Sequence, residues 1–223
     1  MTNTSDTVVV PAQPGESGRQ LVDGSHAMAQ GSGLWTGAKR AWRSFSLNFR
    51  VPGAALDLGN IASQDSLIRD IDAAGVRWRG LIHSAAVLRR RASIDEVTEE
   101  NWDLHIEINL KPTFFLDRAI AEFLIKQGSG DAIVDSTAQG LWSGGFGGSV
   151  VYAATTGGIV SMSRRLARSL APHQIRVNTL APGFVDAPMM RIRLSEEELA
   201  ANVTQVPLGR RASPEGSPTR PSS

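Results

Sequence analysis

Residues 132–183 read AIVDSTAQGLWSGGFGGSVVYAATTGGIVSMSRRLARSLAPHQIRVNTLAPG and contain two strand patterns separated by one helix pattern. The β-branched run at 132–134 precedes a glycine-rich loop, and Tyr152 opens the helical pattern. A second apolar strand pattern follows at 175–180 and ends in Ala-Pro-Gly. A strand–helix–strand unit implies parallel strands, and ligands bind at the carboxyl ends of such strands. The stretch therefore predicts an α/β protein with a ligand site near residues 136–137 and 182–183.

The composition narrows the classes of protein that are compatible with this chain. Its 223 residues suit one α/β domain, and a net charge of +1 does not favour a nucleic-acid partner. The chain has no cysteine, which excludes disulfides and thiolate metal sites, and its four histidines lack metal-ligand spacing. No apolar run is long enough for a membrane span, and the N-terminus lacks a secretory signal. We therefore expect a cytoplasmic protein with no nucleic-acid, membrane or metal partner.

The last residues, GSPTRPSS, differ in composition from the rest of the chain. Segments rich in proline, serine and glycine are typical of disorder. We therefore expect a single domain at residues 1–206 and a disordered tail at 207–223.

Several motifs, taken as a set, resemble the short-chain dehydrogenase/reductase family. That family has a strand ending in a catalytic serine, then a glycine-containing loop, then Tyr-x-x-x-Lys on a helix, then a strand similar to RVNTLAPG. The chain has Ser136-Thr137, YAATT at 152–156 and RVNTLAPG at 176–183, with weaker matches in LIHSAA at 81–86 and INLK at 108–111. The resemblance covers about residues 52–214. It implies a Rossmann-like, doubly wound parallel sheet with helices on both faces, here incomplete at the N-terminal loop and the C-terminal strand.

The resemblance also implies catalytic roles for particular residues. Tyr152 takes the place of the acid/base tyrosine, and Asn109 takes the place of the catalytic asparagine. A gap-free alignment puts Thr137 at the serine position, with Ser136 beside it, and either hydroxyl could polarise a substrate carbonyl. Thr156 stands where the family has its lysine and supplies no charge, so Tyr152 is expected to remain mostly a neutral phenol.

NAD or NADP is the cofactor that the resemblance implies, without a choice between them. In the family's first glycine loop only Gly18 keeps its place, and Glu16 puts a carboxylate where the cofactor pyrophosphate would lie. We therefore expect weak cofactor binding. His83 is expected to be a polar residue on the rim of the cofactor crevice. The other candidate cofactor residues lie after predicted strands: Asp57, Ala85, Pro182, Gly183 and Val185.

Two functions remain open from the sequence. The first is NAD(P)-dependent oxidation or reduction of a small alcohol or carbonyl substrate, with weakened activity. The second is a catalytically inactive partner protein built on the same fold. The helical patterns at 102–126 and 152–170 have wide apolar faces, and in the family these helices pack against a second subunit. We therefore expect a homodimer or homotetramer.

Overall fold

The computed structural model describes residues 8–9, 60–73, 78, 80–128, 131–145 and 149–213. Within these residues four parallel strands form one sheet. In spatial order they are β1 (Val8–Val9), β2 (Gly80–His83), β3 (Ala132–Ser136) and β4 (Arg176–Leu180). The predicted parallel sheet is therefore confirmed, and the predicted strands at 132–134 and 175–180 correspond to β3 and β4.

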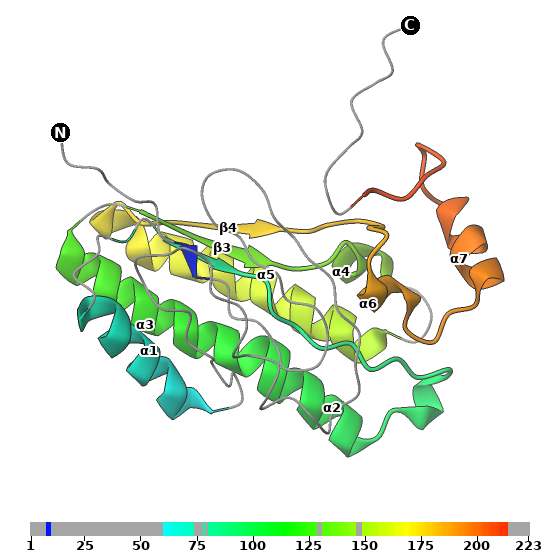
Figure 1. Cartoon of the computed structure of the whole chain (residues 1–223), viewed down its shortest axis with the longest axis horizontal. Coiled ribbons are helices and arrows are strands. Elements are labelled where there is room, and N and C mark those ends of the chain that lie inside the picture. Colours follow the sequence, from blue (N-terminus) through cyan, green and yellow to red (C-terminus); the bar gives the residue numbers. More distant parts are fainter. Residues whose placement is uncertain are drawn as a thin grey trace, which may run out of the picture.

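The main helices run along one side of the sheet, as Figure 1 shows for α1 (Ile61–Ala73), α3 (Lys111–Gln127) and α5 (Val150–Leu170). A further α-helix, α2 (Glu99–His105), leads into α3 through the π-helical η3 (Ile106–Leu110). The predicted helix at 102–126 is therefore confirmed, but it contains one wider turn. The remaining helical segments are short: η2 (Ile94–Glu96), α4 (Gly140–Ser143), η4 (Ala171–His173), α6 (Pro188–Arg191) and α7 (Glu196–Val203).

Specific residues set where the helices begin and end. The Asn101 N–H donates to Thr98 Oγ1, so the Thr98 side chain caps the start of α2. Gly128 ends α3 with a φ of 67°, a conformation that glycine adopts without steric cost. Ser195 and Glu198 bond reciprocally at the start of α7 and form a capping box, as a serine followed three residues later by a glutamate favours.

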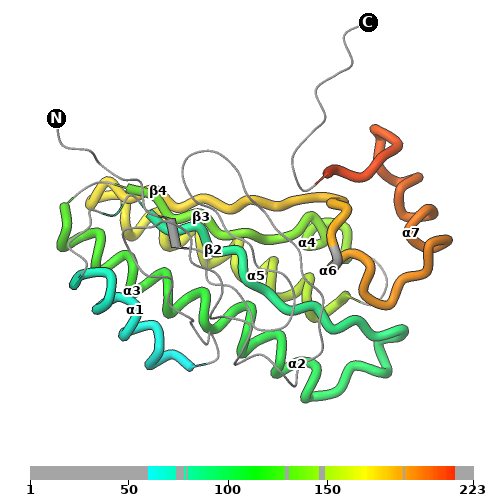
Figure 2. Tube along the Cα trace, viewed as in Figure 1, coloured from blue at the N-terminus to red at the C-terminus, as the bar shows by residue number. Residues whose placement is uncertain are grey.

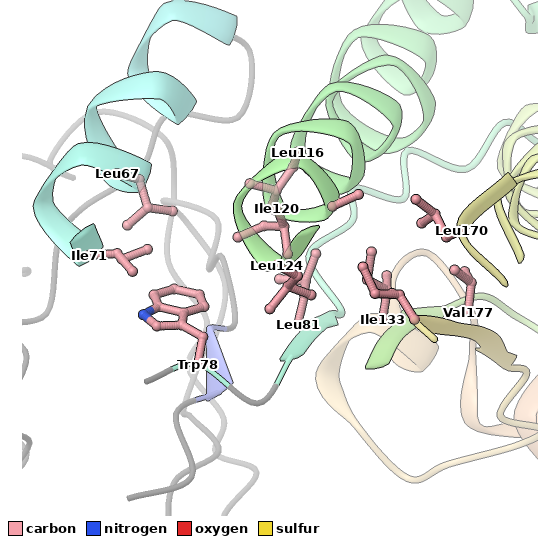
Figure 3. Close-up of a cluster of buried hydrophobic side chains, with 12 residues drawn as sticks. Leu67, Ile71, Trp78, Leu81, Leu116, Ile120, Leu124, Ile133, Leu170 and Val177 are labelled. Atoms are coloured by element: carbon pink, nitrogen blue, oxygen red, sulfur yellow. The ribbon is translucent and has the colours of Figure 1, made fainter. Parts of the chain in front are cut away.

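The core lies between the sheet and this layer of helices (Figure 3). Leu81, Ile133 and Val177 lie side by side across three strands, and their side chains are almost fully buried. Leu116, Ile120 and Leu124 are spaced by four residues, so they share the face of α3 that the core covers. This packing holds the strand ends, where the candidate site lies, in a fixed relation to α5.

The chain beyond β4 leaves the sheet and passes through α6 to α7, as the tube in Figure 2 shows. Arg191 holds this part together through ion pairs of 2.8 Å to Asp186 and 2.7 Å to Glu196. Ala212 then returns to form a parallel bridge with Val185. The folded part thus continues past the predicted boundary at residue 206, at least as far as Ala212.

Some sequence predictions are refined and others fall outside the described ranges. The glycine-rich loop after Thr137 contains a short helix, α4, which the sequence analysis did not predict. The first glycine loop, with Glu16 and Gly18, lies outside the described residues. None of the helices in the described ranges is long and apolar enough to cross a membrane.

Candidate active site

The carboxyl ends of β3 and β4 are tied together by hydrogen bonds. The Thr137 N–H donates to the Leu180 carbonyl at 2.7 Å, and the Thr137 hydroxyl donates to the same oxygen at 3.1 Å. The Gln139 N–H donates to the Pro182 carbonyl at 3.0 Å. Parallel strand ends are the expected ligand site of an open α/β sheet. The structure therefore brings the predicted residues near 136–137 and 182–183 to one place.

Of the two hydroxyls considered for substrate activation, Thr137 is already engaged. Its side chain is 6% exposed, and its proton points to the Leu180 carbonyl. Ser136 is partly buried, and its hydroxyl forms no hydrogen bond with another residue in the described ranges. To polarise a substrate carbonyl, Thr137 would first have to release Leu180.

Asn109 joins three elements at this site. Its side-chain oxygen accepts a hydrogen bond from the Val87 N–H at 2.7 Å, and its Nδ2 donates to the Val87 carbonyl at 2.9 Å. The same nitrogen contacts the Thr155 hydroxyl on α5 at 3.4 Å. Asn109 lies in the π-helical turn η3, a feature that is frequent at functional sites. In this structure the side chain fixes the segment after β2 against α5.

The segment after β2 is held by a second clamp. The Arg89 N–H donates to His105 Nε2 at 3.2 Å, and Asn101 Nδ2 donates to the Arg89 carbonyl at 3.1 Å. His105 is 1% exposed, and its Nδ1 lies 2.7 Å from the Asn101 carbonyl. Burial lowers the pKa of His105, so the ring is neutral, with Nδ1 as donor and Nε2 as acceptor. Sequence reasoning missed this residue, because one of its partners, the Arg89 N–H, lies on a different segment of the chain.

Tyr152 lies in the first turn of α5 and is partly buried. Burial raises the pKa of its phenol, because the anion is poorly solvated there. The positive charge of Arg90 lowers the pKa and is the smaller of the two effects. Tyr152 is therefore a neutral phenol at pH 7, as the sequence predicts. The cation is Arg90, which is 8% exposed although it stands in a run of three arginines, a pattern typical of a solvated surface.

Thr156 shares the Tyr152 face of α5 but does not replace a lysine chemically. Its hydroxyl donates to the Ala153 carbonyl at 3.0 Å, and the side chain is 2% exposed. Thr155 makes the same type of bond to the Tyr152 carbonyl at 2.8 Å. Both hydroxyls are thus satisfied within the helix, and neither supplies charge to the phenol.

The candidate cofactor residues differ in their surroundings. Gly183 is exposed, and a Cβ placed there would meet no atom within 4 Å, so the backbone after β4 is open to a ligand. Pro182, Val185 and Ala85 are partly buried, and Ala85 also packs against the core. The open backbone at Gly183 leaves room for a nicotinamide cofactor at the end of β4. Gly18 and Asp57 lie outside the described residues.

The prediction that His83 lies on the rim of the crevice is wrong. His83 is 2% exposed, because strand alternation puts it on the same face of β2 as Leu81, toward the helices. Burial lowers its pKa to about 4, so the imidazole is neutral. The fold places it beside Asp117 and Asp135, and burial raises the pKa of both carboxyls. A direct cofactor contact by His83 is therefore not supported.

Comparison with known proteins supports the resemblance that the motifs indicate. A family model described as enoyl-(acyl carrier protein) reductase matches residues 38–217. The chain is 35% identical over 135 residues to a 3-oxoacyl-[acyl-carrier-protein] reductase of Thermotoga maritima, with 60% of this chain and 53% of the relative covered. It is 33% identical over 158 residues to the Escherichia coli enzyme of the same name, with 71% and 63% covered.

Solved structures agree with the sequence relatives. A short chain dehydrogenase from Bacillus anthracis superposes with a TM-score of 0.63 at 29% identity, and the match covers 72% of this chain and 63% of that one. The chain therefore belongs to the short-chain dehydrogenase/reductase family of oxidoreductases. It spans a little over half to about two thirds of the length of the first curated relatives that it matches.

Proposed function

We propose that the protein transfers hydride between NAD(P)H and a small carbonyl or alcohol substrate, with Tyr152 as the acid/base residue. The observation that carries this proposal is the hydrogen bond from Asn109 to Thr155 on α5, which places Asn109 beside the first turns of the helix that carries Tyr152. When bound, the cofactor would supply or accept the hydride. The chain itself would hold the substrate oxygen near the Tyr152 phenol and exchange one proton with it.

Proton donation is the direction that this site favours. A phenol with a raised pKa is protonated at pH 7 and can donate to a carbonyl oxygen as negative charge develops there. Arg90 opposes the raised pKa, and its charge would also stabilise the tyrosinate left after the transfer. The buried Thr156 adds no such stabilisation, which supports a slow reductase.

The names of the relatives suggest a substrate class. They include 3-oxoacyl-[acyl-carrier-protein] reductases and a (3R)-3-hydroxyacyl-CoA dehydrogenase from Mus musculus that is 30% identical over 149 residues. A thioester with an oxygen function on carbon 3 is common to these names. We propose 3-oxoacyl thioesters as the first substrates to assay.

Two measurements test the proposed function. Calorimetric titration with NADH and with NADPH measures cofactor binding, which we expect to be weak, and hydride transfer is followed by loss of nicotinamide absorbance with acetoacetyl-CoA. We expect turnover at saturating cofactor to fall by about 100-fold or more in Tyr152→Phe, since general acid catalysis contributes at least that much. Tyr152→Phe with turnover equal to the parent would contradict the assignment.

A non-catalytic partner protein is the second candidate, and Thr156 is the observation that favours it. Its buried hydroxyl occupies the lysine position and bonds to its own helix. This alternative expects no turnover with any carbonyl substrate, even when a cofactor is bound.

We also propose that the chain forms a homodimer or homotetramer. Trp102 on α2 is 49% exposed, and Phe114 and Ile125 on α3 are 39% and 36% exposed, so these helices present apolar groups to solvent. A symmetric contact would cover these groups in both copies. Light scattering at micromolar concentration measures the mass, and a monomer would contradict this prediction. Cytoplasmic location remains a prediction.

A further inference from the structure

Three ionisable side chains lie deep between the sheet and the helices. His83 on β2 is 2% exposed, and Asp117 on α3 and Asp135 on β3 are fully buried. One potential ligand atom from each lies within 4.8 Å of the others. Such groups are almost never fully buried unless they are paired or coordinate a metal.

The register of the sheet explains how they meet. His83 pairs with Asp135 across β2 and β3, two residues beyond the pair of Leu81 and Ile133. Side chains two residues apart on a strand point to the same face, so His83 and Asp135 face the helices together. Asp117 follows Leu116 on the buried face of α3 and approaches them from the helix layer. The three elements that form the core therefore each contribute one ligand atom.

The polar atoms of this cluster are not satisfied by the protein. Five atoms have no hydrogen-bond partner: both ring nitrogens of His83, both carboxylate oxygens of Asp117 and Oδ1 of Asp135. Each unsatisfied buried polar atom costs about 1–3 kcal/mol, and more where the group is charged. Five such atoms in one place indicate a missing binding partner.

Two partners could fill the cluster, a shared proton or a metal cation. Asp117 and Asp135 lie in side-chain contact, and a proton shared between their carboxyls would engage one oxygen of each. Such a proton leaves both His83 nitrogens unsatisfied. A divalent cation would neutralise two carboxylates and bind an imidazole nitrogen at the same time. Neither ring nitrogen of His83 has a hydrogen-bond partner in the described ranges, so one of them can offer its lone pair to a metal.

We propose that His83, Asp117 and Asp135 bind one divalent transition-metal ion, with zinc as the best fit. Imidazole nitrogen together with carboxylate oxygen is a ligand set that zinc accepts, at metal–ligand distances of about 2 Å. Tetrahedral geometry at that distance separates ligand atoms by roughly 3.3 Å, so the ligand atoms would close in on the ion.

Ser163 on α5 supports this assignment. Its hydroxyl donates to Asp135 Oδ2 at 2.7 Å, which orients the carboxylate and leaves Oδ1 as the ligand atom. A hydrogen bond from a neighbouring side chain to a ligating carboxylate is usual around metal sites. The ion would join β2, β3 and α3 and would therefore be structural. This inference does not depend on the proposed oxidoreductase activity.

Metal content of the full chain tests the proposal directly. The protein is produced in zinc-supplemented medium without a polyhistidine tag, and bound metal is measured by mass spectrometry after gel filtration. We expect about one zinc per chain, and removal with a chelator should lower the unfolding midpoint, because binding of a structural ion is coupled to folding. Refolding of metal-free chain with Co²⁺ should produce visible d–d absorption from the bound ion.

Asp117→Asn keeps the side-chain volume and should lose the zinc. The matched control is Asp131→Asn, because Asp131 is also buried, at 5% exposed, and directly precedes β3 but lies outside the cluster. The control should keep the zinc of the parent. If Asp117→Asn does not fold, the visible absorption of the parent refolded with Co²⁺ shows whether the chain binds a metal ion. Parent protein that binds neither zinc nor cobalt, or an Asp117→Asn variant that binds zinc as the parent does, would overturn the proposal and leave a shared proton in the cluster.

Discussion

Two groups of buried polar side chains lie between the same sheet and helices, and their polar atoms have different surroundings. Around Tyr152, the side chains of Asn109, Thr155 and Thr156 are at most 2% exposed and are all hydrogen-bonded within the chain. In the other group, both ring nitrogens of His83 have no hydrogen-bond partner in the described ranges, and the Asp117 carboxyl has only the Asp135 carboxyl beside it. The side chains of the first group form hydrogen bonds mainly with backbone groups. The second group requires a bound ion or a shared proton.

This difference in hydrogen bonding distinguishes side chains that hold the fold in shape from side chains that are free to bind a ligand. Residues whose hydrogen bonds are all made inside the chain can hold a site in shape, but they must break a bond before they act on a ligand. Thr137 illustrates this, because its hydroxyl already donates to Leu180. Unsatisfied buried groups are poor for stability and therefore indicate a ligand or a shared proton. Substitutions in each group can test this distinction.

The largest expected effect is the loss of the Asn109 clamp. Asn109→Ala leaves the partly buried N–H and carbonyl of Val87 without partners, which should lower the free energy of unfolding by about 2–4 kcal/mol. Urea denaturation followed by circular dichroism measures this value. Asn202→Ala on α7 is the control and should change stability by less than about 0.5 kcal/mol. Equal effects of the two substitutions would show that the clamp does not stabilise the fold.

The second effect concerns the charge that Thr156 does not supply. Thr156→Lys places an ammonium one turn from Tyr152 and should lower the pKa of the phenol toward neutrality. We expect carbonyl reductase turnover at saturating cofactor to rise by about tenfold or more, since acid/base catalysis is most effective with a pKa near the working pH. The gain should vanish when Tyr152→Phe is added. Because Thr156 is buried, unfolding of the variant is measured in parallel; a folded, cofactor-bound variant with unchanged turnover would contradict this expectation.

A smaller effect is expected from Arg90→Met. Removing this charge leaves burial unopposed, so the pKa of Tyr152 rises further. Turnover in the reduction direction should fall by less than about tenfold, because the phenol becomes a weaker acid. The alkaline limb of the pH–rate profile should move to higher pH. Arg91→Met is the neighbouring control and should leave the profile in place; a parallel shift in both variants would mean that Arg90 has no specific role.

The smallest effect is a pH dependence of stability that arises from His105. Burial lowers the folded-state pKa below the ordinary value of 6.5, so the unfolded chain binds this proton more readily. The contribution of His105 is therefore present above pH 6.5 and is lost as the pH falls through the folded-state pKa. Urea midpoints at pH 7.5 and pH 5 should differ more in the parent than in His105→Gln. His173→Gln, at an exposed position, should behave as the parent does.

Much of the fold was predictable, because the signals are local. β-branched runs predict β3 and β4, the long amphipathic pattern after Tyr152 predicts α5, and the Ser195–Glu198 spacing predicts the cap of α7. The family motifs also identified the strand ends as the site. Each of these features depends on residues within one or two turns of each other in the chain.

The sequence by itself thus determined the βαβ unit, the family and the positions of Tyr152, Thr137 and Asn109 along it. Only the tertiary structure decided that His83 lies inside rather than on the rim, because that depends on which face of β2 the helices cover. It also brought Arg90 near Tyr152, and Asp117 to His83 and Asp135. These contacts join segments that lie far apart in the chain. No local propensity encodes such contacts, and packing of the whole core sets which side chains meet.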